Sequence, residues 1–184
     1  MDRLFDMEFE RTEFSDENYG IVGRALAFAQ KFEGDCKALR LLIQAKTGEL
    51  DSSLFDDEVA FNKFVSDLHR ESLSEQISQI SKVVHEAIER LGLQSSVDET
   101  LQLARKDRNK IAHEVCLGIQ WDIESDQGRK RLVDEVSDCI RRIAKANLVV
   151  LVISALLTHD DFPRRDYLDA YCDRVLEWVC STEG

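Results

Sequence analysis

The sequence predicts an all-α protein, and two observations support this class. Apolar residues recur at steps of three and four along most of the chain, which is the spacing of one face of an α-helix. The 184 residues include one proline and eight glycines, so few positions interrupt a helix. We expect a bundle of four long helices plus one or two shorter ones, because helices packed side by side bury their apolar faces most simply.

The first half of the chain contains three expected helices. A long one covers residues 16–46, with Ser15 or Asp16 suited to cap its start and Gly48 its end. A shorter one lies within 56–70. A break near 70–72 separates it from the next helix, which carries the clearest apolar stripe of the chain. The stripe and its capping signals comprise Ser72 and Glu75 at the start, Leu73, Ile77, Ile80, Val84, Ala87 and Leu91 within it, and Gly92 as its stop.

The second half contains the remaining helices. Ser96 and Glu99 form a capping-box pattern for a helix that runs to about Leu117. A further long helix covers 128–157, and its second half is apolar on all sides, as expected of a central or interface helix. Pro163 marks the start of the last helix. Its inward-facing residues are expected to be Leu168, Tyr171, Val175 and Val179.

The chain length predicts one domain over residues 1–184, large enough to bury a core of its own. We expect residues 1–14 to be a loose N-terminal segment and 160–184 to be an appended C-terminal helix. The longest apolar stretch, 146–157, is too short to cross a bilayer. The first residues are acidic and lack the apolar run of a signal peptide, and the five cysteines show no CxxC pair, so a cytoplasmic protein is expected.

Residues 105–114, "RKDRNKIAHE", concentrate positive charge in a chain whose formal net charge is −12. Such a charge disfavours broad adhesion to nucleic acid or membrane, so a basic site here must be focused. On a helical wheel Arg108 falls in the middle of the apolar stripe of this helix. An arginine cannot lose its charge, so at such a position it needs a partner, a ligand or a water-filled cleft.

His113 lies about 140° around the wheel from Arg108, on the side that carries Asn109. One straight helix therefore does not aim Arg108 and His113 at one point. A second copy of the helix, brought in by a two-fold dimer, would let them meet. The alternative is structural: Arg108 forms an ion pair within the bundle, with Glu86 or Glu89 as candidate partners, and His113 is an ordinary surface or packed histidine.

The run Arg108-Asn109-Lys110-Ile111-Ala112-His113 resembles the RX4–6H motif of the HEPN superfamily, including the polar residue that follows the arginine. HEPN domains are small all-α bundles of four or five helices. The resemblance covers the helix pattern of about 16–157, but only 108–113 match residue by residue. It implies a homodimer or a heterodimer whose motifs meet in a shared cleft, and we expect a homodimer here. Many members are metal-independent endoribonucleases that act as toxins or antiphage effectors.

The resemblance implies catalytic roles for three residues. His113 serves as base or acid, since histidine titrates near neutral pH, and the two copies in a dimer supply both roles. Arg108 binds phosphate oxygens with a permanently charged planar group, and Asn109 orients the phosphate or the histidine. Flanking RNA phosphates would be held by Arg105, Lys106 and Lys110.

Other functions remain open at this point. Some HEPN proteins are not catalytic and bind a nucleotide or a partner protein, such as a nucleotidyltransferase or an antitoxin. An acidic surface suits docking to a basic partner. A transcriptional regulator is disfavoured by the net charge. No metal or cofactor is expected, because the histidines outside the motif, His69, His85 and His159, have no partner at ligand spacing.

Overall fold

The computed structural model describes residues 13–50, 53, 56–91, 97–115, 125–158 and 164–181. These residues are almost entirely helical and include no strand, which confirms the prediction of an all-α bundle. Their six helices are α1 (Glu13–Thr47), α2 (Glu58–Arg70), α3 (Leu73–Leu91), α4 (Val97–His113), α5 (Asp126–Thr158) and α6 (Arg165–Cys180).

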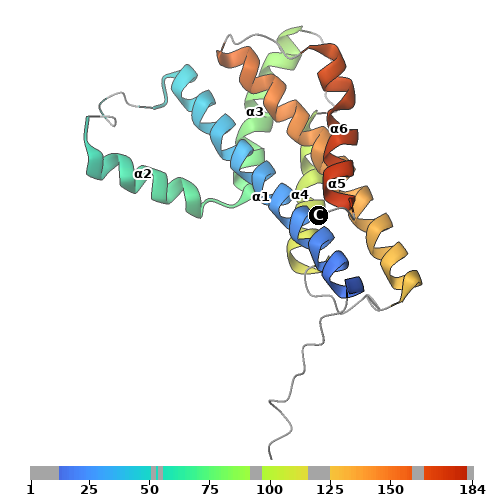
Figure 1. Cartoon of the computed structure of the whole chain (residues 1–184). Helices are drawn as coiled ribbons and strands as arrows, with labels where there is room; N and C mark the ends of the chain where they lie inside the picture. Colours follow the sequence, from blue (N-terminus) through green and yellow to red (C-terminus); the bar gives the residue numbers. More distant parts are fainter. Residues whose placement is uncertain are drawn as a thin grey trace, which may run out of the picture.

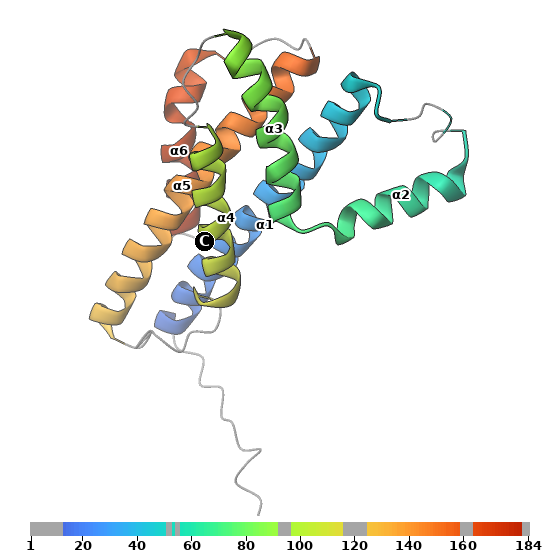
Figure 2. The same cartoon turned by 180° about the vertical axis from the view of Figure 1, so that it is seen from behind.

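Helix α5 is the centre of the bundle (Figure 1), although its buried residues end at Val150 and its apolar last turns are half-buried or exposed. It packs against α1, α4 and α6, while α3 packs against α1 and α4 (Figure 2). Its buried residues recur at helical spacing from Leu132 to Val150. On α1 the buried stripe runs from Ile21 to Ile43 and has fully buried Phe32 in its middle. The two longest helices therefore supply most of the hydrophobic core.

A buried polar group also fixes how α5 meets its neighbours. Asn147 is fully buried on α5, and its Nδ2 donates to Asp35 Oδ2 on α1 at 2.6 Å. The hydroxyl of Tyr171 on α6 donates to Asn147 Oδ1. Burial raises the pKa of Tyr171, as does the nearby Asp35 carboxylate, so the phenol stays a donor. One amide therefore links three helices, and its partners set their rotation about α5.

The helix ends partly follow the sequence signals. α1 begins at Glu13, so Ser15 and Asp16 lie inside the helix and the expectation that one of them caps it is wrong. At the other end Gly48 has a φ of +74°, and the amides of Glu49 and Leu50 donate to the Gln44 carbonyl at 3.0 and 3.2 Å. This left-handed C-cap at glycine is the predicted stop.

The start of α3 is the predicted capping box. The Glu75 amide donates to Ser72 Oγ at 3.3 Å, and the Ser72 amide donates to Glu75 Oε2 at 2.8 Å. α4 ends at His113, short of the expected Leu117. The expected signals at Gly92, Ser96 and Pro163 lie outside the described residues.

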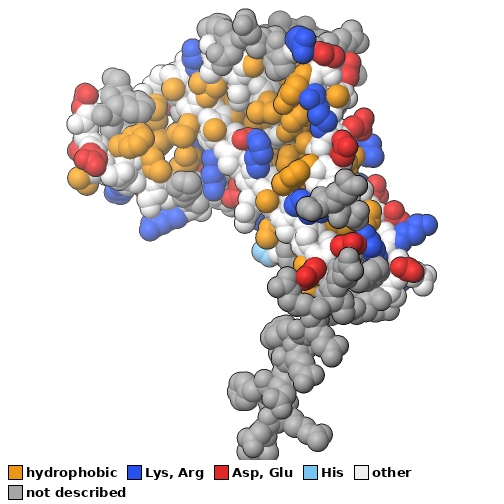
Figure 3. Space-filling model, in the orientation of Figure 1, with side chains coloured by type: hydrophobic (Ala, Val, Ile, Leu, Met, Phe, Trp, Pro, Cys, Tyr) orange, Lys and Arg blue, Asp and Glu red, His pale blue; other side chains and the backbone are white. Residues whose placement is uncertain are grey.

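Helix α2 stands away from the rest of the bundle (Figures 1 and 2). Asp57 caps α2 by accepting from the Val59 and Ala60 amides at 2.9 and 3.1 Å. Hydrophobic side chains gather where α2 faces the second half of α1 (Figure 3), around a hollow of about 330 Å³ lined by Leu41, Leu42, Ala45, Leu50, Phe61, Phe64 and Val65.

The C-terminal helix is part of the bundle rather than an appendage. α6 packs against α5 and α1, and it buries Tyr171 and Val179 in the common core. Arg24 of α1 ties down its end, because its Nε donates to the Val179 carbonyl at 3.0 Å. Within the described part of the chain, no helix is both long and apolar enough to cross a membrane.

Replacing Phe32 by alanine should strongly destabilise the fold, because the side chain is fully buried on α1 and its loss leaves a cavity. We expect the free energy of unfolding to fall by about 3–5 kcal/mol. Phe61→Ala on α2 is the matched control, since this ring is 37% exposed and its loss should cost about 1 kcal/mol or less. Urea unfolding followed by circular dichroism measures both, and equal losses would contradict this description of the core.

Candidate functional site

The candidate site lies on α4, which is held by α5, α1 and α3. The buried residues of this helix are Leu101, Ala104, Asp107 and Ile111. The central position of the buried stripe therefore belongs to Asp107, and the expectation that Arg108 occupies it is off by one residue. Arg108 lies at the edge of the stripe and keeps 23% of its side chain exposed.

Asp107 anchors α4 to α5. Its two carboxylate oxygens accept from Nε and NH2 of Arg142 at 2.6 and 2.9 Å. This two-pronged pair is the strongest geometry available to an arginine and a carboxylate. The hydrogen bond to Asp107 raises the pKa of Arg142, so the guanidinium stays charged and remains a donor to the carboxylate. Arg142 of α5 thus provides both hydrogen-bond donors that the buried Asp107 carboxylate needs.

Arg108 finds its partner on α1. Its NH2 group donates to Glu33 Oε2, and Lys37 Nζ lies 3.0 Å from the other oxygen of that carboxylate. The partner expected for a structural arginine was Glu86 or Glu89, but their side chains lie outside the described part, and Glu33 takes this role. The requirement for a partner is confirmed, and the partner lies 75 residues earlier in the sequence.

The guanidinium of Arg108 also reaches towards the exposed side of α4. Its NH1 donates to Oδ1 of Asn109 at 3.2 Å, while its Nε is buried and has no hydrogen-bond partner among the described residues. Asn109 and His113 are both exposed and lie one turn apart near the end of the helix. The side chain of Arg108 is long and bends towards Asn109. Its guanidinium therefore reaches the side of α4 that carries Asn109, although the wheel separates Arg108 from His113 by about 140°.

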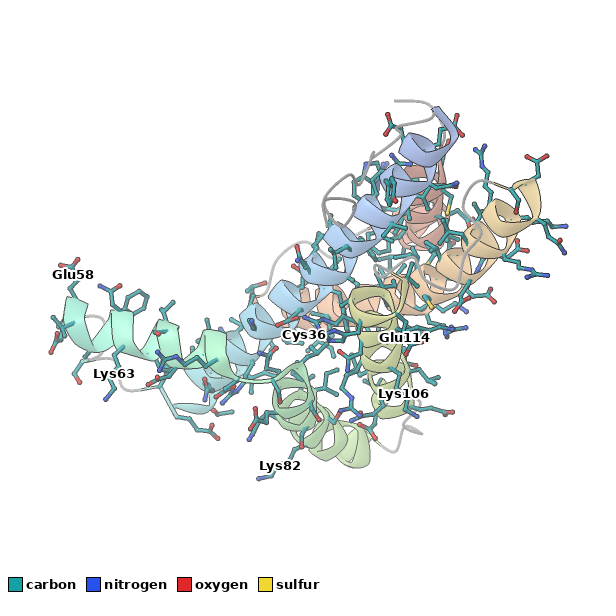
Figure 4. The ribbon with its side chains drawn as sticks, turned by 90° about the horizontal axis from the view of Figure 1, so that it is seen from below. Cys36, Glu58, Lys63, Lys82, Lys106 and Glu114 are labelled. Carbon is teal, nitrogen blue, oxygen red and sulfur yellow. The ribbon has the colours of Figure 1, made fainter. Side chains whose placement is uncertain are left out.

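The three residues predicted to hold RNA phosphates have different environments. Arg105 donates from NH1 to Ser74 Oγ on α3 at 2.9 Å. Lys110 pairs with Glu135 on α5, and this hydrogen bond raises the pKa of Lys110. Lys106 is exposed on the outer side of α4 (Figure 4). Of these three cations, Lys106 is the one most available to a ligand.

A hollow of about 400 Å³ lies between α4 and α5 beside Lys110. Its charged lining balances three cations against three carboxylates and also includes the Cys139 thiol. The lining residues are Lys110, Arg131, Asp134, Glu135, Asp138, Cys139 and Arg142. An RNA-binding groove needs an excess of positive charge. Equal numbers of cations and carboxylates therefore disfavour RNA binding in this hollow.

Metal and thiol chemistry find little support in the described residues. They contain no cluster of three or more His, Cys, Asp or Glu side chains that could hold a metal ion. Burial raises the pKa of Cys36 to about 12 and that of Cys139 to about 11, so neither thiol is a reactive thiolate at neutral pH. Cys116, the cysteine nearest to His113 in sequence, lies outside the described residues.

Replacing Glu33 by glutamine should destabilise the protein near neutral pH and much less in acid. Partial burial raises the pKa of Glu33, but the hydrogen bond from Lys37 and the charges of Arg108 and Lys37 outweigh it, so the pKa lies below its ordinary value of 4.5. The stabilisation is therefore complete above pH 4.5 and is lost as the pH falls through the lowered value.

We expect Glu33→Gln to cost about 1–3 kcal/mol at pH 7, because two cations lose a charged acceptor. Denaturant unfolding at pH 7 and pH 3 measures the difference. Glu58→Gln at the exposed start of α2 (Figure 4) is the control and should change little at either pH. An unfolding free energy that Glu33→Gln leaves unchanged at pH 7 would rule out a stabilising role for this carboxylate.

Comparison with known proteins assigns neither a family nor a fold relative. No protein-family model, no curated protein and no solved structure matches this chain. The resemblance to HEPN domains therefore rests on residues 108–113 and on the helix pattern around them. What the structure adds is the local geometry: Arg108 held by Glu33, next to Asn109, one turn before exposed His113.

Proposed function

We propose that this chain is a HEPN-like, metal-independent endoribonuclease that acts as a homodimer. The observation that carries the proposal is the position of Arg108, whose guanidinium contacts Asn109 at the end of α4 where His113 is exposed. Metal-free RNA cleavage requires a base, an acid and positive charge at the phosphate, and the imidazole and guanidinium on this helix end can supply them.

The reaction needs two proton transfers and stabilisation of negative charge. One His113 removes the proton of the 2′-hydroxyl, whose oxygen then attacks the adjacent phosphorus. The His113 of the second copy protonates the departing 5′-oxygen, which leaves a 2′,3′-cyclic phosphate. Arg108 stabilises the charge that develops on the phosphate oxygens, and Asn109 helps to position them. Lys106 attracts the neighbouring phosphates.

Glu33 gives this site a specific electrostatic constraint. Its carboxylate already binds the guanidinium of Arg108, so an RNA phosphate has to share the arginine or displace the glutamate. Sharing is chemically feasible because a guanidinium has five N–H donors, and Glu33 and Asn109 each accept one of them. Glu33 thereby positions the group that would bind the substrate.

His113→Ala should abolish cleavage of an RNA oligonucleotide by the purified full chain, and Arg108→Lys should lower the rate about 100-fold or more. Both variants should stay folded by circular dichroism, because His113 is exposed and lysine retains the charge facing Glu33. Lys82→Ala, at an exposed lysine of α3, is the control and should remain active, as should the wild type in EDTA. Cleavage by His113→Ala at the wild-type rate would refute the proposed site.

The shared site is tested separately by mixing subunits. When wild type is exchanged with excess His113→Ala, mixed dimers have one histidine and should be inactive, so the activity per wild-type subunit falls. An activity per wild-type subunit that stays constant on exchange contradicts a site built from two copies. Growth inhibition on expression, lost with the same variant, would further favour a toxin or antiphage role.

A second function, a non-catalytic module that binds a partner protein, is favoured by one observation. Two of the four lysine and arginine side chains of α4 are neutralised, because Arg108 pairs with Glu33 and Lys110 with Glu135. A module of this kind would bind a nucleotidyltransferase or an antitoxin, and the protein encoded by the neighbouring gene is the one to test. The complex should survive His113→Ala when the two are co-purified. Loss of the complex on that substitution alone would count against the module.

A further inference from the structure

Helix α6 carries a stripe of large side chains on the side that borders the solvent. Tyr167, Tyr171, Arg174 and Trp178 follow one another at steps of four, three and four residues. Tyr167 is 44% and Trp178 50% exposed, although both are large and partly apolar. Together with Val175 they line a shallow hollow of about 190 Å³. We call these four residues the α6 seam.

The spacing of the α6 seam indicates what shape of ligand fits it. Steps of four and three residues are those of the contact positions of a coiled coil, where one helix lies along another. Tyr171 is buried against the bundle, whereas Tyr167, Arg174 and Trp178 are exposed, so the hollow is open to solvent. An elongated helical ligand therefore suits the stripe better than a small molecule.

Two contacts order Tyr171, Tyr167 and Arg174 of the α6 seam. The Tyr171 ring forms its floor, because this residue is buried and its hydroxyl is bound to Asn147 on α5. The guanidinium of Arg174 lies 4.6 Å from the centre of the Tyr167 ring, in a cation–π contact. Side chains fixed in this way lose little entropy when a ligand binds, so they act as preorganised anchors. Tyrosine, tryptophan and arginine are also the types that most often dominate binding energy in protein interfaces.

The charge beside the α6 seam selects the kind of partner. Exposed Asp166, Asp173 and Glu177 form an acidic row that lies about 100–140° around the helix from Trp178. Glu177 directly precedes Trp178, in the position that flanks the contact stripe of a coiled coil.

The acidic row disfavours three other occupants. A second copy of α6 would place Glu177 of each copy beside the contact and bring together two chains of net charge −12, at a cost in like-charge repulsion. RNA and anionic lipid would be repelled by the same carboxylates. A helix with lysine or arginine beside an apolar stripe would instead place its cations against the row.

We propose that the α6 seam is the docking site for a cationic amphipathic helix of a partner protein. Apolar residues of that helix pack on Trp178, Tyr167 and the hollow between them. Its lysines or arginines pair with Glu177 and Asp173 or lie over the aromatic rings, as Arg174 lies over Tyr167 in the free protein. The proposal is independent of ribonuclease activity, because α6 contributes no residue to the α4 site.

The test uses the purified full chain and a fluorescent three-heptad peptide with leucine at the contact positions and lysine beside them. A twin peptide has glutamate in place of lysine. We expect the lysine peptide alone to raise the fluorescence anisotropy, with an affinity that falls as salt is added. Trp178→Ala and Tyr167→Ala should each weaken binding about tenfold or more, and Asp173→Asn with Glu177→Gln should weaken it as well.

Phe61→Ala is the matched control, because this exposed aromatic residue lies on α2, away from α6. It should change the affinity less than about twofold. Equal binding of the glutamate twin, or equal weakening by Phe61→Ala, would overturn the proposal, as would failure of the lysine peptide to bind. Light scattering measures the molar mass of the chain and of Trp178→Ala. If the chain is a dimer and this variant a monomer, a second copy occupies the α6 seam and the proposal of a cationic partner is wrong.

Discussion

The burial of α5 among α1, α4 and α6 is the constraint on which the other features depend. Its buried stripe has polar contacts on two sides, Arg142 towards α4 and Asn147 towards α6 and α1. A shift of α5 by one residue would rotate its side chains by about 100° and break both sets of contacts. The apolar stripe thus provides the driving force for packing, while these polar groups select a single register. The positions of α4 and α6, and of the residues they expose, follow from that register.

Carboxylates on neighbouring helices decide how much positive charge α4 presents to solvent. The sequence concentrates cations around Arg108, but Glu33 and Glu135 pair with two of them and Asp107 with Arg142. Fewer functional side chains are therefore free to meet a ligand than the basic sequence of 105–114 suggests. The exposed ones are Lys106, Asn109 and His113. A phosphate that approaches this surface meets an arginine already oriented by an ionised glutamate. The contact with Glu33 thus both orients Arg108 and competes with a phosphate for its N–H donors.

Local signals in the sequence predicted the fold class, most helix boundaries and several caps, because these depend on residues a few positions apart. Ser72 with Glu75, and Gly48, are examples that the structure confirms. The helical wheel erred by one residue at Arg108, because the packing of α4 against α5, α1 and α3 buries Asp107 instead. Glu33 could not be found by spacing, since a contact across 75 residues depends on the tertiary arrangement. For α6 the sequence predicted only the inward-facing stripe, of which Tyr171 alone belongs to the α6 seam, and the exposed Trp178 was missed.

Helices α4 and α6 both pack on α5 and lie on different sides of the bundle, with α6 nearer the viewer in Figure 1 and α4 nearer in Figure 2. Neither surface therefore obstructs the other, and a partner on α6 leaves His113 exposed. Any influence of one on the other has to pass through the helices that contact both, α1 and α5. α1 offers the shortest chemical route, because Glu33 binds Arg108 while Asp35, two residues on, binds Asn147 and through it Tyr171. A displacement of Tyr171 by a ligand would act on the same turn of α1 that holds the arginine.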